Sequence, residues 1–153
     1  MSAGSTNFPV GNNTTYRPVL VNFSAVTAPG NLTATQLNGF HPQIAASGLN
    51  STIPKVITPY WKLTSGGVSG TFSATFNFAS ADIPSGALPV NFVVRHYNNP
   101  IWTTNGAGLA AGASMLATGI STFGDFALGE TTGLPTISSQ PSATNVCAAR
   151  TRF

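Results

Sequence analysis

The sequence contains very little charge: of its 153 residues, six are Lys or Arg and three are Asp or Glu. An average soluble domain carries roughly 25% charged residues. Two of the six cations, Arg150 and Arg152, lie within the last four positions. Nucleic-acid binding depends on clustered cations that displace counterions, and no such cluster is present, so we expect no nucleic-acid partner.

Cysteine and long apolar runs are also scarce. The single cysteine, Cys147, excludes an intrachain disulfide and leaves open an intermolecular disulfide or a buried free thiol. No apolar run is long enough for a membrane-spanning helix, and the residues after Met1 do not predict a signal peptide. We therefore expect no membrane insertion. The neutral composition, rich in Ser, Thr, Asn and Gly, favours an extracellular or cell-surface protein over a cytosolic enzyme.

Helical periodicity is almost absent as well. The one Ala-rich stretch, residues 106–120, contains four glycines, each of which costs a helix about 1 kcal/mol. We expect this stretch to form a loop or a short helical turn between strands. Nearly everywhere else the apolar residues recur with a period of two.

That period predicts strands. Residues 70–78 and 88–96 alternate most clearly. Their predicted inward side chains are Phe72, Ala74, Phe76 and Phe78 in the first, and Leu88, Val90, Phe92 and Val94 in the second. Further strands are predicted at 16–23, 31–37, 55–57, 60–64, 101–104 and 121–128. Seven or eight short strands between Gly, Pro and Asn turns predict an all-β fold, an antiparallel Ig-like β-sandwich with a strand-bearing C-terminal extension.

The change of composition after residue 130 suggests two parts. Residues 1–129 are predicted to form the sandwich, with the first residues as a linker or a donated segment. Residues 130–153 are predicted to be a linker and a strand-like extension, because they hold too little apolar mass for a domain. This extension either pairs with its own sandwich or with a neighbouring molecule.

Four motifs carry a resemblance to a known module. They are FPVG at 8–11, YRPV at 16–19, YWKL at 60–63 and FGDFALG at 123–129. In this order they resemble the Ig-like β-sandwich module of long, repeat-bearing, adhesin-like surface proteins secreted by bacteria. PTISSQP at 135–141 with VC at 146–147 resembles the first strand of a following Ig-like domain, which would stay unformed here. The resemblance implies an adhesive or structural surface protein and brings no catalytic residues with it.

An orphan strand in the extension suggests self-assembly. Thr136, Ile137 and Ser138 form the candidate intersubunit strand, which would gain hydrogen bonds by adding to the sheet edge of another copy. Residues 2–13 are an alternative donor. Contacts of this head-to-tail kind that do not close produce filaments. We therefore expect a structural subunit of an extracellular filament or surface array, whose partners are other copies of itself.

The alternative function is a carbohydrate-binding or adhesin module within a larger surface protein. Trp102, Tyr97 and Tyr60 are candidates for stacking on sugar rings, and glycans would be the partners. Trp61 belongs to an alternating strand and is predicted to be buried in the core. For Trp102, which lies near Pro100, both core and surface positions remain open.

Catalytic, metal and cofactor sites are not predicted. The three carboxylates Asp82, Asp125 and Glu130 stand in turn-like contexts and are interpreted as turn residues rather than a hydrolytic pair. His41 and His96 are far apart in sequence and lack neighbouring acids or cysteines, and His96 is expected to be half-exposed on a strand. No nucleophile motif accompanies them.

Asparagine triplets suggest glycosylation. Asn12, Asn13, Asn22, Asn31 and Asn50 each begin an Asn-x-Ser/Thr sequence and are candidate glycosylation sites. A chain so rich in Asn, Ser and Thr also produces this triplet by chance, so both interpretations stay open.

Overall fold

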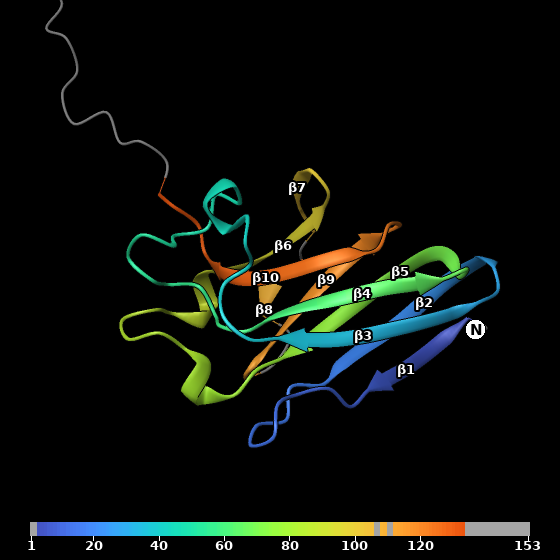
Figure 1. Ribbon diagram of the computed structural model, residues 1–153, viewed down its shortest axis with the longest axis horizontal. Helices are drawn as coiled ribbons and strands as arrows, with labels where there is room; N and C mark the ends of the chain where they lie inside the picture. The colour runs from blue at the N-terminus through green and yellow to red at the C-terminus, as the bar shows by residue number, and fades with distance from the viewer. Residues whose placement is uncertain (1–2, 106–107, 110–111, 134–153) are drawn as a thin grey trace, which may run out of the picture.

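The computed structural model describes residues 3–105, 108–109 and 112–133. They form two five-stranded antiparallel sheets that pack face to face (Figure 1). In spatial order, sheet 1 contains β1 (Gly4–Phe8), β2 (Val19–Ala28), β5 (Ser69–Asn77), β9 (Ser114–Ile120) and β8 (Gly108–Leu109). Sheet 2 contains β3 (Asn31–Leu37), β4 (Tyr60–Gly66), β10 (Gly124–Glu130), β6 (Phe92–Asn98) and β7 (Ile101–Thr104). The prediction of an all-β antiparallel sandwich is confirmed.

The core lies between the sheets and is rich in aromatic rings. Phe76 on β5 of sheet 1 lies 5.5 Å from Trp61 and 4.9 Å from Phe126, measured between ring centroids, and both partners belong to sheet 2. Trp61 is fully buried, as predicted, and its Nε1–H donates to the Arg17 carbonyl oxygen at 3.1 Å. The alternation predicted for 70–78 is confirmed, because the four apolar side chains named for that strand are all buried. Aromatic packing across the interface therefore joins the two sheets.

Several predicted strands coincide with observed ones. Residues 31–37 and 101–104 match β3 and β7 in full, and 60–64 lies within β4. The strand predicted at 16–23 runs instead from Val19 to Ala28, and the one at 121–128 from Gly124 to Glu130. Residues 55–57 form no strand, and Val56 makes only an isolated bridge to Gly129.

Two predictions were wrong for identifiable reasons. Residues 114–120, expected in a loop or helical turn, form β9, where Met115 and Ala117 pair with Phe76 and Ala74 and are buried. Burial against β5 outweighs the weak strand propensity of this stretch. Leu88 and Val90, expected to face inward, are 56% and 74% exposed. Leu88 precedes the 3₁₀ turn η3 (Pro89–Asn91) and Val90 lies within it, so the strand begins only at Phe92.

The N-terminal segment pairs with its own domain. β1 runs antiparallel to β2, in a register from Gly4 opposite Phe23 to Phe8 opposite Val19. Phe8 and Val10 also pack against the core. The suggestion that residues 2–13 are donated to a neighbour is therefore not what this chain shows, since residues 4–8 already occupy a place in their own sheet.

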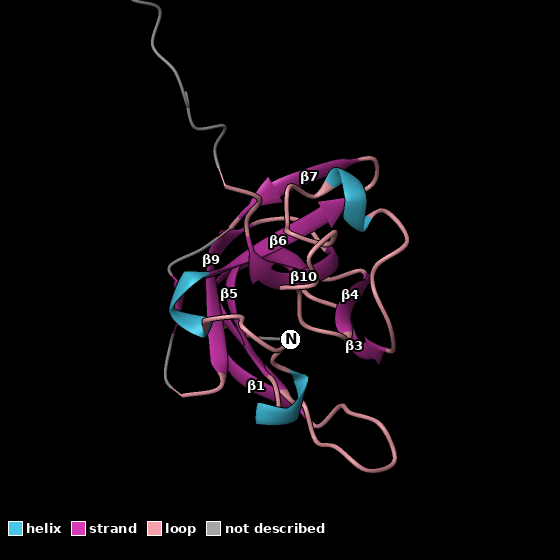
Figure 2. Cartoon of the chain, turned by 90° about the vertical axis from the view of Figure 1, so that its left-hand side faces the viewer, coloured by secondary structure: helices cyan, strands magenta, loops and turns pink. Residues whose placement is uncertain are grey.

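The long connection between β3 and β4, residues 38–59, folds over the outer face of sheet 2. It contains η1 (Ile44–Ala46), which lies next to β7 in Figure 2. A small second core holds it there, made of Leu49, Val56 and Ala127, with Ile44, Val93 and Trp102 packed around them. A Cβ added to Gly129 would lie 2.7 Å from the Lys55 carbonyl oxygen. The connection can therefore approach β10 this closely only because residue 129 has no side chain.

The remaining helical turn among the described residues is η2 (Ser80–Asp82). None of the helices described is long and apolar enough to cross a membrane. The candidate intersubunit strand Thr136, Ile137 and Ser138, the rest of the C-terminal extension, and Cys147 lie outside the described residues.

Candidate functional site on the outer face of sheet 2

The ionisable side chains of the strands all belong to one sheet. Sheet 2 carries Lys62, Arg95, His96, Asp125 and Glu130, whereas the strands of sheet 1 contain no Asp, Glu, Lys, Arg or His. Side chains capable of specific polar chemistry are therefore concentrated on sheet 2.

A row of cross-strand neighbours runs over the outer face of this sheet. Asp125 on β10 pairs with Lys62 on β4 and with Tyr97 on β6. The row continues to Thr35 beyond Lys62 and to Trp102 beyond Tyr97. Side chains directly opposite in antiparallel strands have Cβ atoms about 5 Å apart. This register brings together residues that are up to 90 positions apart in the sequence, since the row contains both Thr35 and Asp125.

The buried ring of His41 lies at the centre of the aromatic part of this face. His41 belongs to the β3–β4 connection and is 4% exposed. Its ring centroid lies 5.0 Å from that of Tyr60, 4.7 Å from Tyr97 and 4.9 Å from Trp102. The structure thus gathers the three residues proposed for sugar stacking. All three rings pack around His41, and their stacking on a sugar stays a prediction.

Two hydrogen bonds set the protonation pattern of His41. The Gln43 backbone N–H donates to Nδ1 at 3.0 Å, so Nδ1 acts as an acceptor. Nε2 therefore carries the proton of the neutral ring and donates to Asp125 Oδ2 at 3.0 Å. No sequence pattern indicated this acid partner, since His41 and Asp125 are 84 positions apart. The consequence is a carboxylate held in one orientation by a buried imidazole.

The second oxygen of Asp125 faces Lys62. Lys62 Nζ lies 4.0 Å from Oδ1, beyond hydrogen-bond distance, and the lysine side chain is half-exposed. Burial and the charge of Asp125 together raise the pKa of Tyr60 above its ordinary value. Its phenol is therefore protonated, and neutral, at physiological pH.

A depression of about 500 Å³ opens beside this carboxylate, and we call it the Asp125 depression. It is lined by Gln43, Lys62, Tyr97, Asn98, Asn99, Gly124 and Asp125. Tyr97 Oη donates to Asn99 Oδ1 at 3.0 Å, and Trp102 Nε1–H donates to the Gln43 carbonyl oxygen at 3.1 Å. Of the three proposed stacking residues, only Tyr97 lines the depression, while Tyr60 and Trp102 support His41 from other sides.

Asp82 is a turn residue, as predicted, whereas Asp125 and Glu130 lie in the strand β10 and not in turns. Asp82 in η2 accepts two 2.7 Å hydrogen bonds from the buried guanidinium of Arg17, and Glu130 at the end of β10 accepts one from Lys55 at 2.9 Å. With Asp125 held by His41, each acid has its own basic partner. Among the described residues, no group of three or more His, Cys, Asp or Glu side chains is arranged to hold a metal ion.

These basic partners lower the pKa values of two of the carboxylates, Asp82 and Glu130. Burial acts to raise the pKa of Asp82, but hydrogen bonds from Arg17 and from the Ala79 N–H outweigh it and hold the pKa below its ordinary value. The Leu88 N–H and the Lys55 ammonium lower the pKa of Glu130 in the same way. Both carboxylates are therefore ionised at neutral pH.

His96 is more deeply buried than the sequence suggested. Expected to be half-exposed, it is 2% exposed and stacks on Phe126 with ring centroids 4.4 Å apart and planes 4° from parallel. Burial lowers the pKa of His96, although hydrogen bonds to the Phe123 backbone and Asn105 oppose this shift. Little room is left around the ring, since a Cβ added to Gly124 would lie 3.0 Å from Nε2 of His96.

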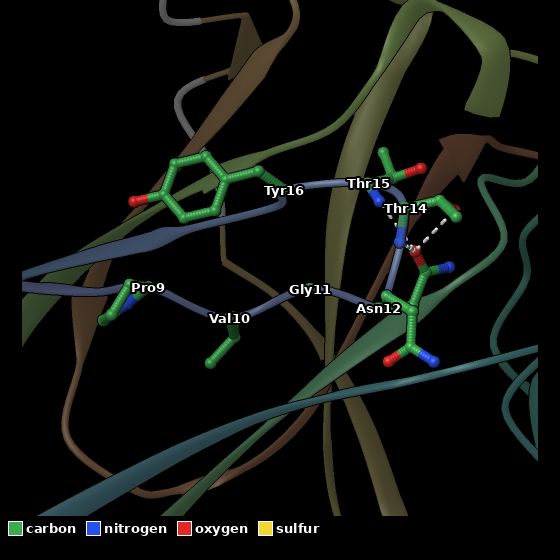
Figure 3. A pocket seen from close by; sticks show the side chains of 8 residues that line it. Pro9, Val10, Gly11, Asn12, Thr14, Thr15 and Tyr16 are labelled. Carbon is green, nitrogen blue, oxygen red and sulfur yellow. Dashed lines mark hydrogen bonds between the residues drawn. The ribbon is translucent and has the colours of Figure 1, made fainter.

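A second depression, of about 380 Å³, lies in the turn between β1 and β2 (Figure 3). Asn12 Oδ1 accepts hydrogen bonds from the backbone N–H groups of Thr14 and Thr15 and from the Thr14 hydroxyl. A Cβ on Gly11 would collide with the Thr15 carbonyl oxygen. The end of FPVG and the start of YRPV thus flank a tight turn, where Gly11 and Tyr16 form an isolated bridge. The residues that line this depression supply no carboxylate or amine for a ligand.

The candidate glycosylation sites differ in accessibility. Asn12, Asn13, Asn22 and Asn31 are exposed. Asn50 is half-buried, and its Oδ1 accepts a hydrogen bond from the Ile53 N–H at 3.2 Å. Glycosylation stays a prediction at all five, with Asn50 the least accessible.

The site on sheet 2 therefore consists of a fixed carboxylate, a nearby ammonium, an aromatic wall and several amides around one open depression. Its residues come from four separate parts of the chain, which the sandwich brings to one face. Neither a protein-family model, nor a curated protein, nor a solved structure matches this chain.

Proposed function

We propose that this protein is a structural subunit of an extracellular filament or surface array that assembles through its sheet edges. The observation that carries the proposal is the composition of two edge strands. β1 (GSTNF) and β3 (NLTATQL) are the first strands of their sheets and contain no charged residue and no proline. Each is bonded within its sheet to a single neighbouring strand.

Edges of this kind favour the addition of another strand. Soluble β-proteins usually protect exposed edges with lysine, proline, bulges or very short strands, because an open edge pairs readily with other chains. β1 and β3 have five and seven residues and neither a charge nor a proline to oppose pairing. An added strand would gain main-chain hydrogen bonds there without desolvating an ion.

The rest of sheet 1 supports the same function. Its outer face presents Asn22, Ser24 and Thr71, which are exposed and uncharged. Copies packed against such a face experience little like-charge repulsion. The resemblance to modules of bacterial surface proteins supports an extracellular location, and we propose Thr136, Ile137 and Ser138 as the strand that is donated.

Electron microscopy and sedimentation of the full chain at near-physiological salt test the proposal. Wild type should form filaments or sheets. The double variant Ser5→Lys/Asn7→Lys places two charges on β1 and should raise the concentration needed for assembly about tenfold, the equivalent of 1.4 kcal/mol. The matched control is Ser121→Lys/Thr122→Lys, which places two charges in the exposed turn between β9 and β10, outside both edge strands and the outer face of sheet 1, and should have a much smaller effect.

A second variant addresses the donated strand. Ile137→Asp introduces a charge into the proposed intersubunit strand and should reduce assembly as strongly as the β1 variant. Monomeric wild type at every concentration tested would contradict the proposal. Filaments that survive both Ile137→Asp and the β1 variant would show that the subunits join through other surfaces.

A further inference from the structure

The Asp125 depression has the volume of a small-ligand site and a mostly polar lining. Its volume of about 500 Å³ falls within the range that such sites occupy. The lining comes from the β3–β4 connection, from β4, from the end of β6 with the following turn, and from the start of β10. Polar groups from four segments therefore converge on one open space next to a rigid sheet.

The carboxylate in this space is positioned before any ligand arrives. Asp125 Oδ2 accepts the hydrogen bond from His41, whose ring is buried and surrounded by three aromatic side chains. Oδ1 faces the depression and Lys62 Nζ at 4.0 Å, a separation too long for a direct hydrogen bond. A ligand hydroxyl between the two could donate to Oδ1 and accept from the ammonium. Binding would then cost little ordering of the protein.

The charge balance of the depression selects a neutral ligand. Asp125 repels phosphates and other anions, while Lys62 offsets it and disfavours a simple cation. The remaining polar groups, from Gln43, Asn98 and Asn99, each offer amide or backbone donors and acceptors. A ligand that matches them needs several hydroxyl groups and no net charge.

One wall is aromatic. Tyr97 is half-buried, and its ring contributes apolar surface to a depression that is otherwise polar. Pyranose rings combine an apolar face of C–H groups with a rim of hydroxyls, which fits an aromatic wall beside a carboxylate and amides. We propose that the Asp125 depression binds neutral pyranose oligosaccharides, with Tyr97 as the wall and Asp125, Lys62 and Asn98 as hydroxyl partners.

This site is independent of the assembly proposed above, because it lies on the outer face of sheet 2 and not on the edges β1 and β3. It also differs from the platform expected from the sequence. Tyr60 and Trp102 act indirectly, by holding His41 and thereby Asp125, and only Tyr97 would touch the sugar.

Saturation-transfer difference NMR with the full chain tests the proposal, and it works for monomers and assemblies alike because the ligand is observed. The probes are cellopentaose, mannopentaose and chitopentaose, three neutral oligosaccharides, with a heparin hexasaccharide as the acidic comparison. We expect saturable transfer to ring protons of at least one neutral probe. Absence of transfer to all three, or transfer to the heparin fragment alone, would overturn the proposal.

Variants locate the binding. Lys62→Ala and Asn98→Ala change exposed side chains at the depression and should each weaken binding of the responding probe about tenfold. The matched control, Thr64→Ala, changes an exposed side chain on the same face of β4 outside the depression and should bind like wild type. Equal affinities for all four proteins would place the sugar elsewhere and contradict the assignment.

Discussion

The two sheets share one core but have outer faces of opposite character. Facing inward, both supply buried aromatic and aliphatic side chains, and Phe76 of sheet 1 packs directly on Phe126 of sheet 2. Facing outward, sheet 1 presents neutral Ser, Thr and Asn side chains, while sheet 2 presents Lys62, Asp125 and Arg95. The comparison shows that a common packing requirement fixes the inner faces and leaves the outer faces free to specialise.

The covering of the outer faces differs too. Residues 38–59 fold over part of sheet 2, where they bury His41 and create the small core around Leu49. On sheet 1, the central strands β2 and β5 keep Asn22, Ser24 and Thr71 exposed. A covered face can fix polar groups in one geometry for a ligand, whereas an open neutral face suits contact with other copies.

The largest effect should come from breaking the shared core. Phe76→Ala should lower the free energy of unfolding by about 3–5 kcal/mol, because it removes the ring that contacts Trp61 and Phe126 across the interface. Urea unfolding followed by tryptophan fluorescence measures the loss. Phe126→Ala should cost about as much, since the inner faces are equivalent.

The control for this comparison is on the same strand. Thr71→Ala changes the exposed face of β5 and should cost about 1 kcal/mol or less. Comparable losses for Phe76→Ala and Thr71→Ala would mean that the core does not join the sheets as described.

A smaller effect should appear on acidification, and it should arise from sheet 2. The pKa of buried His96 is lowered below its ordinary value of 6.5. Between the folded pKa and 6.5 the unfolded chain binds a proton that the folded chain does not, so stability is complete above about pH 6.5 and falls as the pH drops below it. Melting temperatures measured from about pH 8 to about pH 5 should show this decline.

His96→Gln isolates the contribution of the histidine. The variant should lose the decline below about pH 6.5. In a scan extended to about pH 3, it should keep the further fall that begins at about pH 4, because there the unfolded chain takes up protons at Asp82 and Glu130 while the folded chain, in which both pKa values are lowered, does not. An unchanged pH profile in His96→Gln would assign the decline to another group.

The smallest effect should come from removing the ammonium group of Lys62, which belongs to the row of cross-strand neighbours on the outer face of sheet 2. Lys62 is half-exposed and 4.0 Å from Asp125. Lys62→Ala should therefore lower the free energy of unfolding by about 1 kcal/mol or less, and added salt should reduce the difference further. Urea unfolding at low and high salt measures it. A loss of several kcal/mol would show that the lysine supports the fold, and its use as a binding variant would then be compromised.

Sequence reasoning found the strands whose side chains alternate strongly and missed those that do not. The alternation of 70–78 and the burial of Trp61 followed from period and residue type alone. β9 was missed because it lies in the Ala-rich stretch with four glycines, where the apolar residues have no clear period of two. Its pairing with β5 fixes it as a strand. Leu88 and Val90 were misplaced since a 3₁₀ turn interrupts the period without any strong sequence signal.

The candidate site, too, was predicted from the sequence only in part. Tyr60, Tyr97 and Trp102 were grouped from their chemistry, but the grouping lacked His41 and Asp125, which hold the site together. No local pattern connects residues 41 and 125. Asp125 can be placed opposite both Lys62 and Tyr97 only when the strand register is known.

Composition and a period of two are enough to predict the all-β class and the identity of the main core residues, because both are local properties of the sequence. Three features emerge only in the folded chain: the charged and histidine side chains of the described strands all fall on one sheet, His41 is buried against Asp125, and His96 is enclosed. These features join residues that are distant in the chain, so they depend on the strand register and on the path of the β3–β4 connection, which no local pattern encodes.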